Sequence, residues 1–219
     1  MPTMRRRVQL TALAALGLMM TVAAPGGAGV QPAPTGVSTT IEVVADGLNA
    51  PRGLVYDPDL RRVLVAEAGV VAENTGPCGF AERGLPFCLG HSGSIFEYSE
   101  AGAPARRIVT GLPSTALQIP GTSVVIGLHD VTLLEGRLTV AFGTLGNEPY
   151  RQSLGAGAAL LGQIATVGGS GKLKPIADIL TFIDQRYAPD HFEANPYGVI
   201  TGSYGAAVAN AGGPGPDRG

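Results

Sequence analysis

The side chains best suited to chemistry stand where short apolar runs of the sequence begin or end. They comprise two carboxylates, an imidazole, a guanidinium and two amides, namely Asn49, Arg52, Glu67, His129, Asp130 and Asn195. Carboxylate and amide oxygens can coordinate a cation, and the mixed set could bind a polar ligand. The same residue types also cap turns by bonding to nearby backbone groups. The sequence leaves both roles open for these six residues.

No recognisable catalytic or cofactor motif accompanies these residues. The sequence contains no nucleophile elbow, metal-ligand spacing, phosphate loop or dinucleotide fingerprint. We therefore predict no catalytic residue, no metal site and no cofactor, and favour a binding or scaffold module. Its partner would be a small molecule, a glycan or a protein. The alternative is an enzyme in which His129 acts as a general base and Glu67 as an acid or metal ligand.

The two cysteines, Cys78 and Cys88, predict a disulfide. In a protein exported from the cytoplasm, an even number of cysteines at short spacing is typical of a bridge. Free thiols and a metal site are the alternatives, although two cysteines alone make a poor zinc site. The bridge would hold the glycine-rich loop between them.

Residues 1–28 have the pattern of a secretory signal peptide. A basic stretch of three arginines at residues 5–7 precedes an apolar run over residues 10–24 and small residues up to Ala28. The apolar run is shorter than the ~20 residues that a transmembrane helix needs. We therefore predict a secreted or periplasmic protein with no membrane insertion after cleavage. Residues 29–40, rich in proline, glycine and threonine, are predicted to be a disordered linker.

Composition points away from nucleic acid and toward strands. The formal net charge is −2, and cleavage of the signal would remove three arginines and make the chain more acidic. It therefore has no electrostatic footprint for nucleic acid or an anionic membrane. Charged residues are 15% of the chain and 33 residues are glycine, which favours short strands and turns over long helices.

Short apolar runs bounded by turn signals predict a repeated unit of four strands. A lone strand is predicted first, at residues 41–44. The first unit comprises residues 53–56, 63–66, 94–98 and 105–110; the second comprises 131–134, 138–141, 160–167 and 173–177; and a third begins with 196–200 and 206–209. Apolar residues at helical spacing predict one short helix over residues 177–187, with Asp178 and Asp184 facing solvent.

The units share short stretches of similar sequence as well as the strand pattern. Residues 50–55 parallel 195–200, and residues 65–69 parallel 208–212. Repeated four-stranded units predict an all-β fold over residues 41–212, namely an incomplete β-propeller of about two and a half blades. In a propeller, the residues that open first strands and close second strands gather at one mouth, where the six candidate residues would lie. A β-sandwich is the competing fold.

Several of these segments, in their order and spacing, resemble the ScyD/ScyE family of secreted, NHL-like β-propellers. The segments are residues 47–54, 63–69, the cysteine loop before 93–95, then 127–131, 177–180 and 195–198. The resemblance covers roughly residues 41–212 and implies an extracytoplasmic propeller with no settled biochemical activity.

The chain departs from the family pattern at its end. Family members continue for several more blades, whereas this sequence stops within the third unit, and residues 213–219 do not continue the blade and are predicted to be a disordered tail. We therefore expect a C-terminally truncated member, with a non-functional fragment as one outcome. Residues 47–69 also resemble the opening of quinoprotein sugar dehydrogenases and propeller lactonases, which is the basis of the enzymatic alternative.

Overall fold

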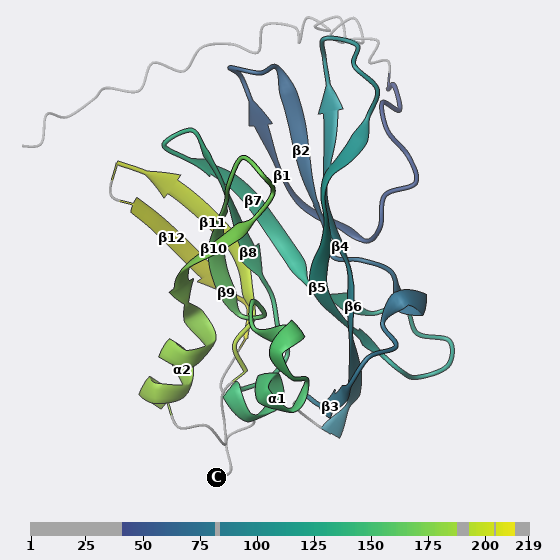
Figure 1. Cartoon of the computed structure of the whole chain (residues 1–219), viewed down its shortest axis with the longest axis vertical. Helices are drawn as coiled ribbons and strands as arrows, with labels where there is room; N and C mark the ends of the chain where they lie inside the picture. The colour runs from purple at the N-terminus through teal and green to yellow at the C-terminus, as the bar shows by residue number, and fades with distance from the viewer. Residues whose placement is uncertain (1–40, 82–83, 188–192, 204, 213–219) are drawn as a thin grey trace, which may run out of the picture. The chain divides into compact units, whose positions relative to one another are not determined.

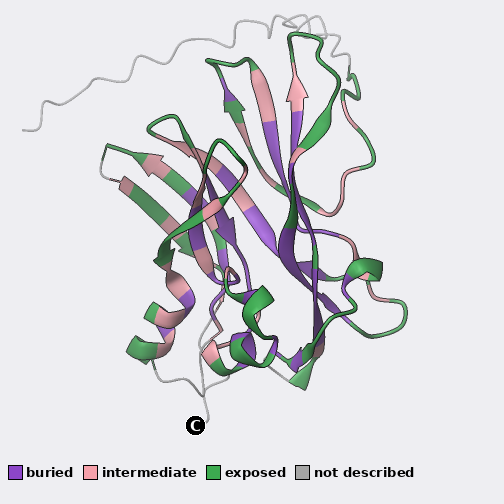
Figure 2. Ribbon diagram, viewed as in Figure 1, coloured by how far each residue is buried: buried purple, intermediate pink, exposed green. Residues whose placement is uncertain are grey.

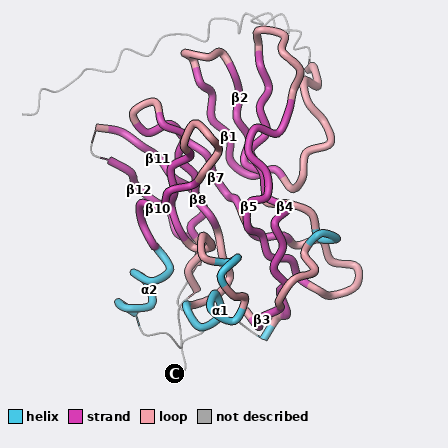
Figure 3. Tube along the Cα trace, viewed as in Figure 1, coloured by secondary structure: helices cyan, strands magenta, loops and turns pink. Residues whose placement is uncertain are grey.

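The structure, a computed structural model, is built mainly from antiparallel strands joined by tight turns (Figures 1 and 3). It describes residues 41–81, 84–187, 193–203 and 205–212. The predicted signal peptide, linker and tail lie outside the described residues. The predicted strand-rich fold with antiparallel sheets is confirmed. The strand predicted at residues 41–44 is wrong, because this segment has no regular secondary structure and Ile41 is 88% exposed.

The first sheet contains the predicted first unit. Its four main strands follow one another in space as in sequence: β1 (Pro51–Asp57), β2 (Arg62–Glu67), β4 (Pro86–Ser99) and β5 (Arg106–Leu117). Two short strands join it, β3 (Cys78–Phe80) beside β4 and β6 (Val125–Ile126) beside β5. The β1–β2 turn forms where Asp57 accepts a hydrogen bond from the Leu60 N–H (3.2 Å), as the Asp-Pro-Asp sequence favours.

The second unit forms a sheet of four strands, and the third forms a hairpin. The sheet contains β7 (Leu128–Leu134), β8 (Arg137–Phe142), β9 (Gln163–Val167) and β10 (Leu173–Asp178). The hairpin consists of β11 (Pro196–Gly202) and β12 (Gly205–Asn210). The β7–β8 turn is tight because Glu135 and Gly136 both adopt positive φ, at 50° and 72°. The first strands of the three units are neighbours, with β7 contacting both β1 and β11 (Figure 1).

The three hairpins that begin the units share two structural details. In each, the register shifts just after the first pair of residues, which are Pro51 with Glu67, Leu128 with Phe142, and Pro196 with Asn210. In each, the same backbone bond precedes the shift: Ala68 N–H to Ala50 O (3.1 Å), Gly143 N–H to Gly127 O (2.8 Å) and Ala211 N–H to Asn195 O (2.8 Å). The segments of similar sequence therefore occupy equivalent places in their hairpins. A β-bulge recurs at the start of every unit.

The main core lies where the first two sheets face each other. Alternate residues along the strands point inward, as the pleat requires, and Leu64, Ile95, Leu128, Val140 and Phe142 are fully buried there. Figure 2 shows burial concentrated along β4, β7 and β8, whereas β12 is largely exposed. A second cluster surrounds the lower part of β4 and includes Phe87, Leu117, Tyr150 and Leu161.

The sequence did not predict several elements around this second cluster. They are the extension of β4 from residue 86 to 93, strands β3 and β6, the helix α1 (Glu148–Ser153), and the 3₁₀ turns at Val71–Glu73 and Ala156–Ala158. Asn147 caps the start of helix α1, where its side chain accepts a hydrogen bond from the Tyr150 N–H (3.1 Å). The predicted helix is present as α2 (Ile179–Tyr187), which buries Leu180 and Ile183. No helix in the described ranges has the length and apolar character needed to cross a bilayer.

The predicted disulfide between Cys78 and Cys88 is present. The two residues are direct partners across the β3–β4 pair, with their Cα atoms 3.9 Å apart. Next to them, Gly79 lies against α1, where an added Cβ would come within 2.4 Å of Ser153 Oγ and 3.1 Å of the Tyr150 ring. The bridge therefore holds β3 in the place where α1 packs on it.

Candidate functional site

The bulges at the starts of the three hairpins bring three side chains into one row, which we call the bulge row: Arg52, His129 and Tyr197. Each is the residue at the register shift of its unit. The His129 and Tyr197 rings lie 4.9 Å apart between centroids. Arg52 donates to the Val125 carbonyl (2.9 Å), and its positive charge lowers the pKa of His129. Residues far apart in the sequence thus meet because the first strands of the units are neighbours.

Two of these three residues were predicted from the sequence, and Tyr197 was missed. The signal for Tyr197 was available in the parallel between residues 50–55 and 195–200, which aligns it with Arg52. Tyr197 is 46% exposed, and Arg52 is exposed as well, whereas His129 is buried. An exposed aromatic ring offers a flat, partly apolar contact surface for a ligand.

His129 is buried and neutral, and its Nε2 atom is a free hydrogen-bond acceptor. Its side chain is 1% exposed, and Nδ1 lies 3.2 Å from the Pro196 carbonyl oxygen. Since a carbonyl only accepts, Nδ1 carries the proton and donates, which leaves a lone pair on Nε2. Burial, followed by the nearby charge of Arg52, lowers the pKa of His129 to about 4, against the opposing effect of the Pro196 carbonyl. The imidazole is therefore uncharged at neutral pH.

Three buried polar atoms of the second and third units have no hydrogen-bond partner among the described residues. They are His129 Nε2, Thr144 Oγ1 and Asn195 Oδ1, and we call them the unpaired polar set. Gly143 lies between two of them, since a Cβ there would come within 2.1 Å of His129 Cε1 and 2.7 Å of Asn195 Oδ1. Any larger residue at position 143 would force these side chains apart. The close approach of these polar groups thus depends on a glycine.

Asp130 joins the first strands of the units to one another. Its Oδ1 accepts from the Val131 N–H (2.9 Å), and its Oδ2 accepts from the Val199 N–H of β11 (2.8 Å). The carboxylate lies against Gly53 of β1, where an added Cβ would come within 1.9 Å of Oδ1. Both oxygens bond to backbone, so the structure favours the capping role that the sequence left open for this residue.

Glu67 and Asn49 belong to a separate, fully paired network at the end of β2. Glu67 is completely buried and accepts from the Asn49 N–H (2.6 Å), from the Ser94 hydroxyl, and from Arg107 through Nε (2.8 Å) and Nη2 (2.9 Å). Its oxygens are thus fully engaged. In the third hairpin, Asn210 takes the equivalent place and accepts from the Asn195 N–H (2.7 Å). In the described part of the chain, no cluster of three or more His, Cys, Asp or Glu could hold a metal ion.

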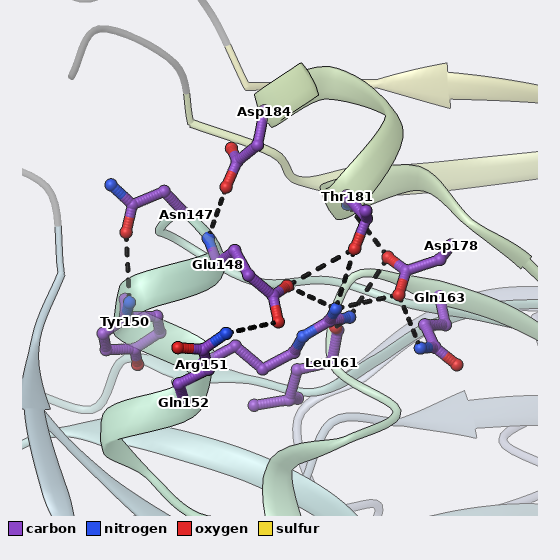
Figure 4. Close-up of polar contacts among 10 residues, drawn as sticks. All are labelled: Asn147, Glu148, Tyr150, Arg151, Gln152, Leu161, Gln163, Asp178, Thr181 and Asp184. Atoms are coloured by element: carbon purple, nitrogen blue, oxygen red, sulfur yellow. Dashed lines mark hydrogen bonds and ion pairs between the residues drawn. The ribbon is translucent and has the colours of Figure 1, made fainter. Parts of the chain in front are cut away.

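A second polar cluster, centred on Arg151, lies between α1, α2 and the second sheet (Figure 4). Arg151 Nη1 donates to Leu161 O (3.0 Å) and Asp178 Oδ1 (3.1 Å); Nη2 donates to Asp178 Oδ2 (2.8 Å), to Thr181 Oγ1 (3.0 Å) and to Glu148. The guanidinium is nearly buried, and the pairs shown in Figure 4 surround it on several sides. We call Arg151 and its partners the Arg151 cluster.

The prediction that Asp178 and Asp184 face solvent is wrong. Burial alone would raise the pKa of Asp178, but hydrogen bonds from Arg151, the Thr181 N–H and Gln163 hold it below its usual value. Asp184 accepts from the Glu148 N–H at the start of α1, and burial raises its pKa. The sequence could not reveal these roles because Arg151, which pairs with Asp178, and Glu148, whose N–H bonds to Asp184, both belong to α1, an element it did not predict.

Comparisons of the chain with protein-family models, with curated proteins and with solved structures find no match. The geometry of the bulge row and of the unpaired polar set therefore carries the functional argument.

Proposed function

We propose that this protein is an extracytoplasmic binding module of the ScyD/ScyE type, and that the bulge row is its binding face. Support for a β-propeller comes from a six-stranded sheet whose four main strands follow in order, then a four-stranded sheet and a hairpin, with the first strands of all three as neighbours. The disulfide suits a protein exported through the signal peptide that residues 1–28 resemble.

The unpaired polar set is the observation that carries this proposal. A buried polar atom without a partner costs about 1–3 kcal/mol, and two such atoms, His129 Nε2 and Asn195 Oδ1, belong to side chains packed around Gly143. His129 Nε2 and Asn195 Oδ1 are acceptors, and the Thr144 hydroxyl can donate or accept. A neutral ligand rich in hydroxyl or amide donors satisfies such a set, with Tyr197 and Arg52 at its solvent side.

Binding is favoured over catalysis by the state of Glu67. The enzymatic alternative needs Glu67 as an acid or metal ligand, yet its oxygens are engaged by Asn49, Ser94 and Arg107. His129 retains a free lone pair, but among the described residues no second titratable side chain hydrogen-bonds to it. As a general base, His129 would have no acidic side chain to orient it or to stabilise its charged form. As a hydrogen-bond acceptor, it needs no such partner.

The test is a nitrogen-15 NMR titration of the imidazole rings with neutral monosaccharides and polyols as probes. We expect one or more probes to shift the Nε2 resonance of His129 saturably, because a new donor reaches its lone pair. Tyr197→Ala should weaken that binding by about tenfold, in line with the loss of one aromatic contact. Tyr187→Ala, which removes a comparably exposed ring from α2, is the matched control and should leave the affinity unchanged. Equal losses in both variants, or no shift with any probe, would contradict the proposal.

A further inference from the structure

A groove of about 390 Å³ separates the ends of the first two sheets, at a place distinct from the bulge row. We call it the inter-sheet groove. Its walls come from β5, from the β7–β8 hairpin and from the turn between β9 and β10, through Arg106, Ile108, Leu133, Arg137, Leu138 and Val167. The volume is within the usual range of small-molecule sites, about 300–1,000 Å³.

The floor of the groove is aliphatic. Ile108, Leu138 and Val167 pack against the main core but are only half buried, so the groove exposes the end of that core. The turn from Gly168 to Gly171 forms one side, where an added Cβ at Gly169 or Gly171 would meet no atom within 4 Å. The floor therefore offers apolar contact and no aromatic ring or uncharged polar side chain that would select a peptide sequence.

The rim of the groove carries an excess of positive charge. Arg62 is held by Asp57 (3.0 Å) and Glu97 (2.6 Å), so this inner group is internally paired. Arg106 shares the same Glu97 at 3.3 Å and is 70% exposed. Arg137 is exposed, and among the described residues no ion pair engages it. Two guanidinium groups, one from each sheet, can therefore turn toward the same anion.

We propose that the inter-sheet groove binds a medium-chain fatty acid. The hydrocarbon chain would lie on Ile108, Leu138 and Val167, which removes apolar surface of both partners from water. Its carboxylate would lie between Arg106 and Arg137, whose planar guanidinium groups match a carboxylate better than a lysine would. This site is independent of the function proposed for the bulge row.

Isothermal titration of the full chain with decanoate, below its micellar concentration, tests the proposal. We expect saturable binding of decanoate, with decanol bound at least about tenfold more weakly because it lacks the charge. Arg137→Gln and Arg106→Gln should each lower the affinity for decanoate by about three- to tenfold. The expected loss is modest because both arginines are exposed and solvent screens their charge. Arg186→Gln, an exposed arginine on α2 outside the groove, should have no effect.

Each other outcome would overturn the proposal. Absence of saturable decanoate binding removes the site. Equal affinities for decanol and decanoate remove the role of the arginines. A loss with Arg186→Gln as large as with Arg137→Gln indicates attraction by overall charge instead of a groove. Because these variants leave His129 and Tyr197 untouched, the neutral-ligand titration of the bulge row is a separate result.

Discussion

The Arg151 cluster and the unpaired polar set are both buried and polar, but they differ in how their hydrogen-bonding capacity is used. In the Arg151 cluster, the two terminal nitrogens of the guanidinium meet two carboxylates, a hydroxyl and a carbonyl. In the unpaired polar set, three side chains each keep one atom without a partner in the described structure. Pairing at the guanidinium holds elements together in the Arg151 cluster, although Gln163 Oε1 and Asp184 Oδ1 beside it have no partner among the described residues. The open positions of the unpaired polar set call for another group, which is a water or the proposed ligand.

The two regions also differ in what they join. The Arg151 cluster connects α1, α2 and β10, which lie within one stretch of chain from residue 148 to 187. The unpaired polar set consists of residues from β7, from the segment after β8 and from the position just before β11. It therefore spans two successive units of the chain, as the proposed binding role requires.

The largest expected effect comes from removing the charge at the centre of the Arg151 cluster. Arg151→Met should destabilise the protein by about 3–5 kcal/mol, because Asp178 and Glu148 would stay partly buried without their partner. Urea unfolding followed by far-ultraviolet circular dichroism measures the change. Arg186→Met, on the exposed side of α2, is the control and should change stability by less than about 0.5 kcal/mol. A loss below about 1 kcal/mol for Arg151→Met would show that the cluster does not hold the helices.

A smaller effect is expected from acid, and it comes first from the bulge row. The folded-state pKa of His129, about 4, lies below its ordinary value of 6.5, so the unfolded chain binds a proton more readily. Stability should therefore fall as the pH drops from 6.5 toward 4, by on the order of 3 kcal/mol in total. His129→Gln should flatten the pH dependence within this window. The paired Asp178, whose pKa is lowered, contributes stability that is lost only at more acidic pH.

Unfolding midpoints measured at intervals across that pH range check this expectation. The variant His91→Gln removes an exposed imidazole and is the matched control. An unchanged pH profile in His129→Gln would mean that the imidazole is not buried as described, and the hydrogen-bonding argument for the bulge row would fail with it.

Much of this fold could be predicted from local pattern, and the exceptions have physical causes. Short apolar runs bounded by turn signals predicted β1, β2, β7, β8, β11 and β12, because in these hairpins the sequence carries both the strands and their turns. The strand over residues 86–93 was not predicted because its glycine, cysteine and proline residues are typical of a loop. Pairing with β3 and β5 makes this segment a strand. Three of residues 41–44 are β-branched and apolar, but a strand needs a partner, and the described structure offers none.

The candidate site was predicted in part for the same reason. Arg52 and His129 were found because they stand where a first strand begins, which a repeat pattern reveals. The different uses of Glu67 and of the Arg151 cluster were not predictable. Arg107 lies 40 residues from Glu67, and Asp178 lies 27 residues from Arg151, so only the fold brings the partners together. Pairing between distant side chains is a property of tertiary structure that no local spacing encodes.

The smallest effect tests the contrast with a matched pair of substitutions, Thr144→Val and Thr181→Val. Thr181 accepts a hydrogen bond from Arg151 (3.0 Å), so losing its hydroxyl should cost about 1 kcal/mol. Thr144 is fully buried with its hydroxyl unpaired, so Val should be neutral or stabilise the free protein by up to about 1 kcal/mol. Paired urea titrations of the two variants measure the difference, whose sign matters more than its size. If Thr144→Val destabilises the free protein as much as Thr181→Val does, the hydroxyl of Thr144 already has a partner, such as a bound water. The unpaired polar set would then be a structural cluster like that of Arg151.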